Sequence, residues 1–173
     1  MISRLLPCFL SAILWLAAGG IGRATEAWLR VTWAEKSVVL SEAEWAKLPR
    51  TEVTSADPHT KTEHRYAGVA MREVLHLVQA PTDKDLRGAA QRLAVLVRGR
   101  DGYAVLFALA EFDPAFSART ILLADRIDGL PLPEKAAPLQ VIAPGDRRGA
   151  RWARMVTAIE IVSVPAGVGA GKP

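Results

Sequence analysis

Short stretches of alternating, apolar or β-branched residues dominate the chain, and turn-forming residues separate them. Asp101-Gly102 and Asp128-Gly129 are dipeptides that tolerate positive φ, so they favour tight turns between strands. The pattern predicts strands over residues 28–33, 37–40, 50–56, 62–66, 93–97, 103–109, 120–124, 139–143 and 158–164.

Helical signals are few. Apolar residues recur at the spacing of one helix face from Met71 to Val78, and Pro81 ends that segment. A shorter helix is predicted after Ser41, because Ser41 and Glu44 have the spacing of a capping box. Strands outnumber helices and do not alternate regularly with them, which argues against a doubly wound sheet. We expect an α+β domain with a mixed, curved β-sheet or partial barrel and a few short helices.

The first residues show the three-part pattern of a secretory signal peptide. A basic start at Arg4 precedes an apolar run over 5–21, and small residues offer cleavage after Ala24 or Ala27. We expect a signal peptide over 1–27, a domain over 28–165 and a flexible Gly- and Pro-rich tail over 166–173. The expected location is the periplasm or the exterior, with no stable membrane span after cleavage; the alternative is an uncleaved anchor.

Cysteine content restricts the chemistry. Cys8 is the one cysteine of the chain, and it lies inside the predicted leader. After cleavage the domain has no thiolate, so thiol redox chemistry, thiolate nucleophiles and cysteine-based zinc sites are excluded. The net charge of +4 is mild and gives no indication of nucleic-acid binding.

No motif of a common enzyme class stands out. The chain lacks a Gly-x-Ser-x-Gly elbow, a Walker loop and a strand-associated Gly-x-Gly-x-x-Gly. His59 and His64 flank a polar turn, but no third ligand stands at a recognised spacing, so no metal site is expected.

The segment with most chemical content follows the predicted strand 139–143. After a Pro-Gly turn come Arg147, Arg148 and Arg151, and then Trp152. Guanidinium groups fork onto phosphate and carboxylate oxygens, so these four residues are the candidates for an anion-binding site. The alternative is a solvated arginine loop whose tryptophan fills the core.

Four segments of the chain, taken in the order in which they occur, resemble segments of the sulfite-oxidase-like oxidoreductase molybdopterin-binding domain family. They span about residues 50–162 and are YAGVAMREVL at 66–75, DGY at 101–103, LLADRIDGLPL at 122–132, and PLQVIAPGD at 138–146 with its continuation through Trp152 to Ile161. The resemblance implies the fold of that domain, and a basic ending that grips a pterin phosphate. It makes molybdopterin possible as a cofactor.

The chain departs from the family where the metal would be held. The resemblance implies a molybdenum-ligating cysteine ahead of the Gly-Val segment, and the residues here, 54–59, contain none. Serine or aspartate would hold the metal differently from a soft thiolate.

Three functions follow from these observations, and whether the chain is an enzyme stays open. The first is a non-catalytic exported module that binds an anionic small molecule or a periplasmic protein through the arginine loop, with no cofactor. The second is a reduced molybdopterin-dependent oxidoreductase with Asp57 or Ser55 as a non-cysteine ligand. The third is a structural subunit that presents an apolar patch with Trp28, Trp33 or Trp45. We expect the first.

Overall fold

The computed structural model describes residues 27–165. The predicted leader, except for Ala27, and the predicted tail lie outside the described residues, and so does Cys8.

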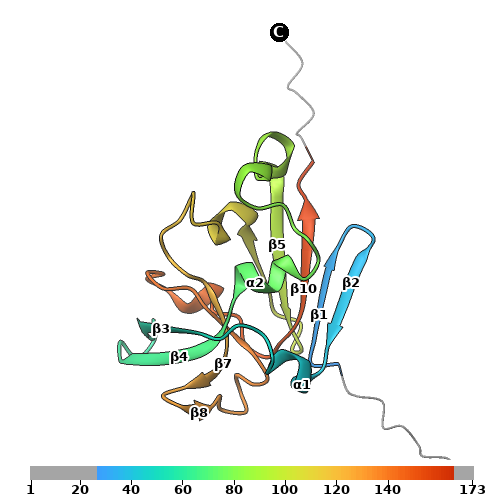
Figure 1. Ribbon diagram of the computed structural model, residues 1–173. Helices are drawn as coiled ribbons and strands as arrows, with labels where there is room; N and C mark the ends of the chain where they lie inside the picture. The colour runs from blue at the N-terminus through green and yellow to red at the C-terminus, as the bar shows by residue number, and fades with distance from the viewer. Residues whose placement is uncertain (1–26, 166–173) are drawn as a thin grey trace, which may run out of the picture.

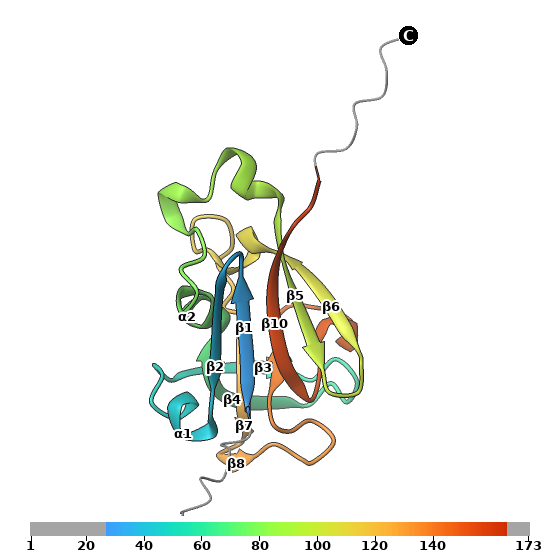
Figure 2. The same cartoon turned by 90° about the vertical axis from the view of Figure 1, so that its right-hand side faces the viewer.

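Two five-stranded sheets form the domain (Figure 1). The first sheet, seen face-on in Figure 2, has the order β2-β1-β10-β5-β6. Its strands are β1 (Leu29–Trp33), β2 (Lys36–Leu40), β5 (Leu93–Gly99), β6 (Ala104–Ala108) and β10 (Val156–Ser163). β1 pairs with β10 in parallel, and the other pairs are antiparallel.

The second sheet has the order β3-β4-β7-β8, and β9 also pairs with β7. Its strands are β3 (Thr51–Ala56), β4 (Glu63–Ala70), β7 (Leu122–Ile127), β8 (Leu130–Pro131) and β9 (Gln140–Ile142). The expected α+β class with mixed strand pairing and few short helices is confirmed, and the strands divide between two sheets.

The two α-helices are short: α1 (Glu42–Trp45) and α2 (Met71–His76). The predicted capping box is present, since the Glu44 N–H donates to Ser41 Oγ (3.3 Å) and the Ser41 N–H donates to Glu44 Oε2 (2.8 Å). Among residues 27–165, no helix has both the length and the apolar character needed to cross a membrane.

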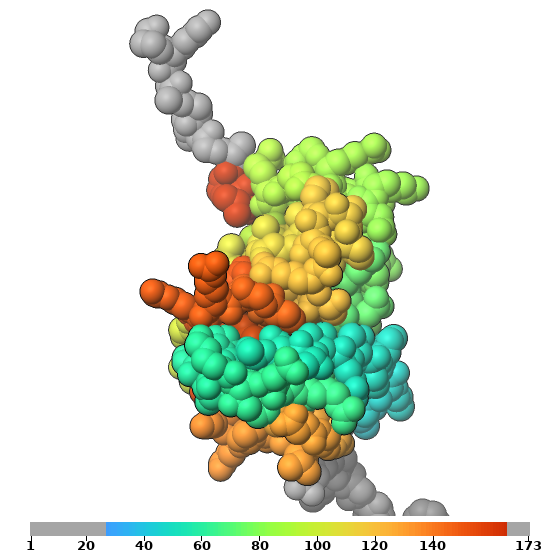
Figure 3. Space-filling model, turned by 90° about the vertical axis from the view of Figure 1, so that its left-hand side faces the viewer, coloured from blue at the N-terminus to red at the C-terminus, as the bar shows by residue number. Residues whose placement is uncertain are grey.

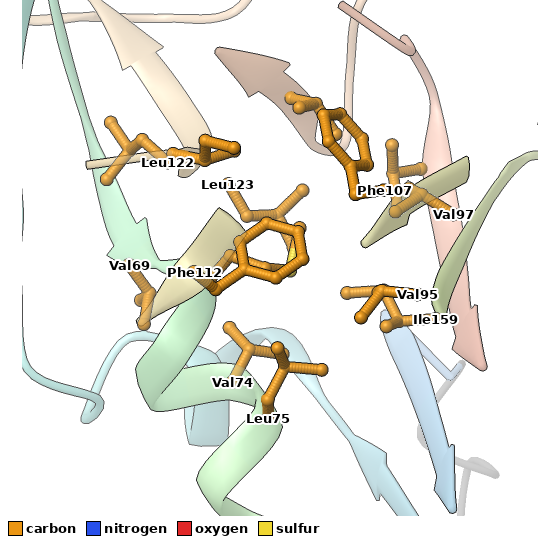
Figure 4. Packing of buried hydrophobic residues seen from close by; sticks show 14 of the residues in the cluster. Val69, Val74, Leu75, Val95, Val97, Phe107, Phe112, Leu122, Leu123 and Ile159 are labelled. Atoms are coloured by element: carbon orange, nitrogen blue, oxygen red, sulfur yellow. The ribbon is translucent and has the colours of Figure 1, made fainter. Parts of the chain in front are cut away.

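One hydrophobic core lies between the sheets and α2. Figure 4 shows Val74 and Leu75 of α2 with Phe112, Val95 and Ile159 around the same space. All five are 8% exposed or less. The alternating pattern of the strands therefore places one face of each sheet against a shared interior.

Gly68 explains why β4 runs further than its sequence pattern predicted. The strand was expected to end at Tyr66, but it continues to Ala70 through a register shift against β7. A Cβ at Gly68 would overlap the carbonyl oxygen of Leu123 and lie 2.6 Å from Ala124 Cα. Glycine is needed here for close contact of two backbones.

Four charged side chains fix the segment that connects β9 to β10. Residues 144–151 of this segment are called the arginine loop below. Arg151 Nε and Nη2 donate to the Asp146 carboxylate (2.9 and 2.8 Å), and Arg151 Nη1 donates to Glu111 Oε2 (2.9 Å). Arg119 joins the same two carboxylates, at 2.9 Å from Asp146 and 2.6 Å from Glu111. The Arg151 guanidinium also lies 4.7 Å from the ring centre of Phe107.

These contacts set the ionisation of Asp146. Partial burial acts to raise the pKa of this carboxyl, but hydrogen bonds and charge from Arg151 and Arg119 outweigh it, so the pKa lies below its ordinary value. The pairing therefore stabilises the fold when Asp146 is ionised, at a pH above about 4.

Replacing Gly68 tests the backbone contact between β4 and β7. Gly68→Ala should lower the free energy of unfolding by at least about 2 kcal/mol, because the methyl group has no space. Gly88→Ala is the control: its φ is 57°, but the added methyl meets no atom within 4 Å, so backbone strain alone should cost about 1 kcal/mol. Urea denaturation measures both, and equal losses would contradict the account.

Replacing Asp146 tests the charged network. Asp146→Asn should lower the free energy of unfolding by about 1–3 kcal/mol at pH 7, because two guanidinium groups lose their charged partner. The lowered pKa means that wild type loses this advantage as pH falls below about 4, so the two proteins should then converge in stability. Chemical denaturation at pH 7 and pH 3 checks this. A difference that does not change with pH would show that the charge of Asp146 contributes nothing.

Candidate functional site

Three turns, together with Trp152 and Arg154, line an open pocket of about 600 Å³. They are the β3–β4 turn (residues 57–62), the β5–β6 turn (100–103) and the arginine loop. Figure 3 shows the β3–β4 hairpin directly beside the orange-red segment around residue 148. Segments distant in sequence therefore meet at one concave surface.

Positive side chains dominate the lining of this pocket, which is called the cationic pocket below. Its basic residues are His59, Lys61, Arg147, Arg148 and Arg154. Asp101 is the one carboxylate in the lining, and its Oδ1 accepts the backbone N–H of Tyr103 at 3.0 Å. With histidine taken as neutral, four permanent cations face a single anion, so the pocket attracts negative charge.

The arginines of this region fall into two groups. Arg119 and Arg151 are bound to Asp146 and Glu111. Arg147, Arg148 and Arg154 have no carboxylate within 4.0 Å in the part of the chain that the structure describes. Their guanidinium donors are therefore available to a ligand.

The structure separates Arg151 from the other sequence-predicted site residues. Arg147, Arg148 and Trp152 line the cationic pocket, whereas Arg151 does not. Hydrogen bonds to Asp146 raise the pKa of Arg151, and those to Glu111 add to the effect, so Arg151 stays charged and these two carboxylates balance its charge. Arg151 positions the arginine loop, and its neighbours present free donors.

Trp152 lies in the lining beneath these cations, and Tyr66 packs against it from the core side, outside the pocket lining. Trp152 is 5% exposed and donates its Nε1–H to the Ala143 carbonyl (3.1 Å). Its ring meets Tyr66 edge-on at 5.6 Å between centroids. Burial raises the pKa of Tyr66 to about 12, with the charges of Asp57 and Asp128 adding to this, so the hydroxyl stays protonated. Trp152 thus both fills the core and lines the pocket.

Sequence reasoning did not select four residues of the pocket as ligand-binding candidates. They are His59, Lys61, Tyr103 and Arg154. Arg154 lies only three residues after Arg151 in the sequence, but His59 and Lys61 lie about 90 residues before it, and nothing in their spacing indicates that they meet. Tertiary contact brings them together: His59 packs so closely on Gly149 that a Cβ there would lie 2.5 Å from its Nε2.

His64 does not join the pocket. Its Nδ1 lies 2.7 Å from Asp128 Oδ2, across to the turn after β7. Within residues 27–165, no three His, Cys, Asp or Glu side chains are grouped to hold a metal ion.

The residues present do not fit the metal part of the cofactor that the family resemblance implies. In place of the expected cysteine stands the β3–β4 turn, where Asp57 Oδ1 accepts the backbone N–H groups of His59 (2.7 Å) and Thr60 (3.2 Å). Burial acts to raise the pKa of Asp57, but these hydrogen bonds and nearby positive charge lower it overall. This carboxylate is engaged in shaping the turn, and residues 27–165 offer no thiolate.

Comparison with known proteins places the fold. The crystal structure of the sulfane dehydrogenase SoxCD from Paracoccus pantotrophus is similar, with a TM-score of 0.60 and 16% sequence identity. The match covers 79% of this chain but 38% of that one, so this chain spans well under half of its length. At this identity the likeness shows the fold alone. No curated protein matches the chain.

A family model matches nearly the whole domain. The model described as the oxidoreductase molybdopterin binding domain matches residues 29–167, which include both sheets and all three turns of the cationic pocket. The chain therefore belongs to the oxidoreductase molybdopterin-binding domain family.

Proposed function

We propose that this domain is a non-catalytic binding module that holds an anionic small molecule in the cationic pocket. One observation carries the proposal: Arg147, Arg148 and Arg154 line one pocket without a carboxylate partner among the described residues, while adjacent Arg119 and Arg151 are fully engaged. Free guanidinium groups around a concave surface are the usual means of holding phosphate, sulfonate or carboxylate groups.

The size and lining of the pocket favour a small organic anion. A volume of about 600 Å³ lies within the range of ligand pockets and exceeds the needs of inorganic phosphate. Tyr103 and Trp152 add apolar surface next to the cations. An acidic segment of a periplasmic protein would find the same charges, but the concave shape favours the small molecule.

The non-catalytic part of the proposal rests on the side chains that face the pocket. No thiolate is available in residues 27–165, and the Asp57 carboxylate accepts two backbone N–H groups in its own turn. Ser55, the other non-cysteine candidate, is not part of the pocket lining. This arrangement supports binding and orientation of a ligand, and among residues 27–165 no group of three candidate ligand side chains could hold a metal ion.

The proposed setting is outside the cytoplasm. Its support is the leader pattern over residues 1–27, with a basic start, an apolar run and small residues at the cleavage region. A cysteine-free domain keeps the same covalent structure in an oxidising compartment.

Titration with defined anions tests the proposal. Phenyl phosphate should bind more tightly than inorganic phosphate, because its ring can contact Tyr103 and Trp152 while its phosphate meets the cations. Arg148→Ala should weaken phenyl phosphate binding about tenfold or more, since a charge-assisted hydrogen bond contributes about 1.5–3 kcal/mol. Isothermal titration calorimetry at low and moderate salt measures both effects.

Arg87→Ala is the matched control for this experiment. Arg87 is also an exposed loop arginine, but it lies outside the pocket. Binding to this variant should equal that of wild type. If neither probe binds at millimolar concentration, or if both variants lose affinity equally, the pocket is not a specific anion site.

A further inference from the structure

The first sheet ends on β6, which pairs with β5 on one side and with no strand on the other (Figure 2). The Gly99 N–H donates to the Tyr103 carbonyl at 2.8 Å, which marks these residues as a hydrogen-bonded pair at the start of the hairpin. Hydrogen-bonded and non-bonded pairs alternate along antiparallel strands. Val105 and Phe107 therefore bond to β5, and Ala104, Leu106 and Ala108 direct their backbone groups away from it.

Little inside the domain satisfies these outward groups. The Ala108 N–H donates to Glu111 Oε1 at 3.1 Å. Within residues 27–165, the N–H groups of Ala104 and Leu106 have no hydrogen-bond partner on the outer side. Unpaired edge groups are a template for pairing with another strand.

β6 also lacks the side chains that normally protect an edge strand. Its sequence, AVLFA, contains no charge, proline or glycine, and Leu106 is 51% exposed. The edge strands β2 and β3 carry charges: Lys36 begins β2, and Glu52 lies in β3. Charged side chains on an edge discourage pairing with a second chain, so β6 is the unprotected edge of this domain.

The strand is symmetric about Leu106. Ala104 and Ala108 lie two residues before and two residues after Leu106, on the same exposed face of the strand. Val105 and Phe107 lie one residue before and one after it, on the buried face. An antiparallel pair of identical strands about Leu106 places Leu106 opposite itself, Ala104 opposite Ala108 and Val105 opposite Phe107 of the other copy, so the strand tolerates its own copy only when no like charges face each other. β6 meets this condition at every position.

We propose that two copies of this chain pair through β6, antiparallel about a two-fold axis at Leu106, to join their first sheets into one continuous sheet. Leu106 exchanges both backbone hydrogen bonds with its copy, and each Ala104 N–H donates to the Ala108 carbonyl of the other chain. Glu111 keeps the Ala108 N–H. The exposed Leu106 side chains then cover each other beside Leu96, which pairs with Leu106 across β5.

Charged neighbours do not oppose this arrangement. Arg98 of β5 lies level with Ala104, and it forms an ion pair with Glu160 of β10 at 3.8 Å on the same face. The two-fold axis places Arg98 of one copy and Arg98 of the other at opposite ends of the contact. A five-residue edge buries a small interface, so the dimer belongs to the weak class, with a dissociation constant on the order of 1–100 µM.

Sedimentation velocity of the purified chain from about 1 to 500 µM tests the proposal. A monomer–dimer equilibrium is expected in this range. Leu106→Lys should weaken dimerisation at least tenfold, because like charges meet at the axis. Val39→Lys is the matched control: Val39 is 43% exposed on β2, the opposite edge of the same sheet, and its variant should dimerise as wild type does.

Disulfide trapping fixes the register. In a Cys8→Ser background, Leu106→Cys should form a disulfide-linked dimer under mild oxidation, because mirrored residues in a bonded pair lie within disulfide reach. Val39→Cys should stay monomeric under the same conditions. A chain that is monomeric up to 500 µM, a dimer that survives Leu106→Lys, or equal trapping of both cysteines would overturn the proposal. Circular dichroism confirms that each variant is folded.

Discussion

The arginine loop depends on one interaction, the pairing of Arg151 and Arg119 with Asp146 and Glu111. Asp146 is 11% exposed at its side chain, and both of its partners are about a third exposed, so the charges are held at the edge of the core and not on open surface. This network uses two arginines and two carboxylates entirely within the domain. It holds the loop so that Arg147 and Arg148 project into the pocket with no carboxylate partner among the described residues.

The positive charge of the cationic pocket thus follows from the way in which the arginine loop is held, because Asp146 and Glu111 pair with Arg151 and Arg119 and with neither Arg147 nor Arg148. If Asp146 and Glu111 were placed to neutralise Arg147 or Arg148, the surface would be an ordinary solvated face. Because the carboxylates face inward, the positive charge stays outside, next to Arg154 and Lys61. The fold of an oxidoreductase family is kept here, with an anion-attracting surface and without a thiolate in the described residues. That combination is the support for proposing binding in place of redox chemistry.

Local sequence signals predicted most elements, because they depend on neighbouring residues. The capping box at Ser41, the hairpin at Asp101-Gly102 and the amphipathic α2 all appear where the pattern placed them. Long-range features were not predictable in this way. The division into two sheets, the extension of β4 through Gly68 and the contact of His59 with Gly149 each depend on segments far apart in sequence. The surroundings of Trp45 also depend on a distant segment. Trp45 was a candidate for an exposed patch, but it is 1% exposed and donates its Nε1–H to Asp125.

The central claim is that the pocket binds an organic anion without a metal centre. Its most direct test is metal analysis by inductively coupled plasma mass spectrometry of the chain purified from cells supplied with molybdate, with the same preparation then titrated with phenyl phosphate. The account predicts molybdenum far below one atom per chain, together with measurable binding of the anion. Molybdenum retained at about one atom per chain with a pterin, and a pocket closed to phenyl phosphate, would contradict it.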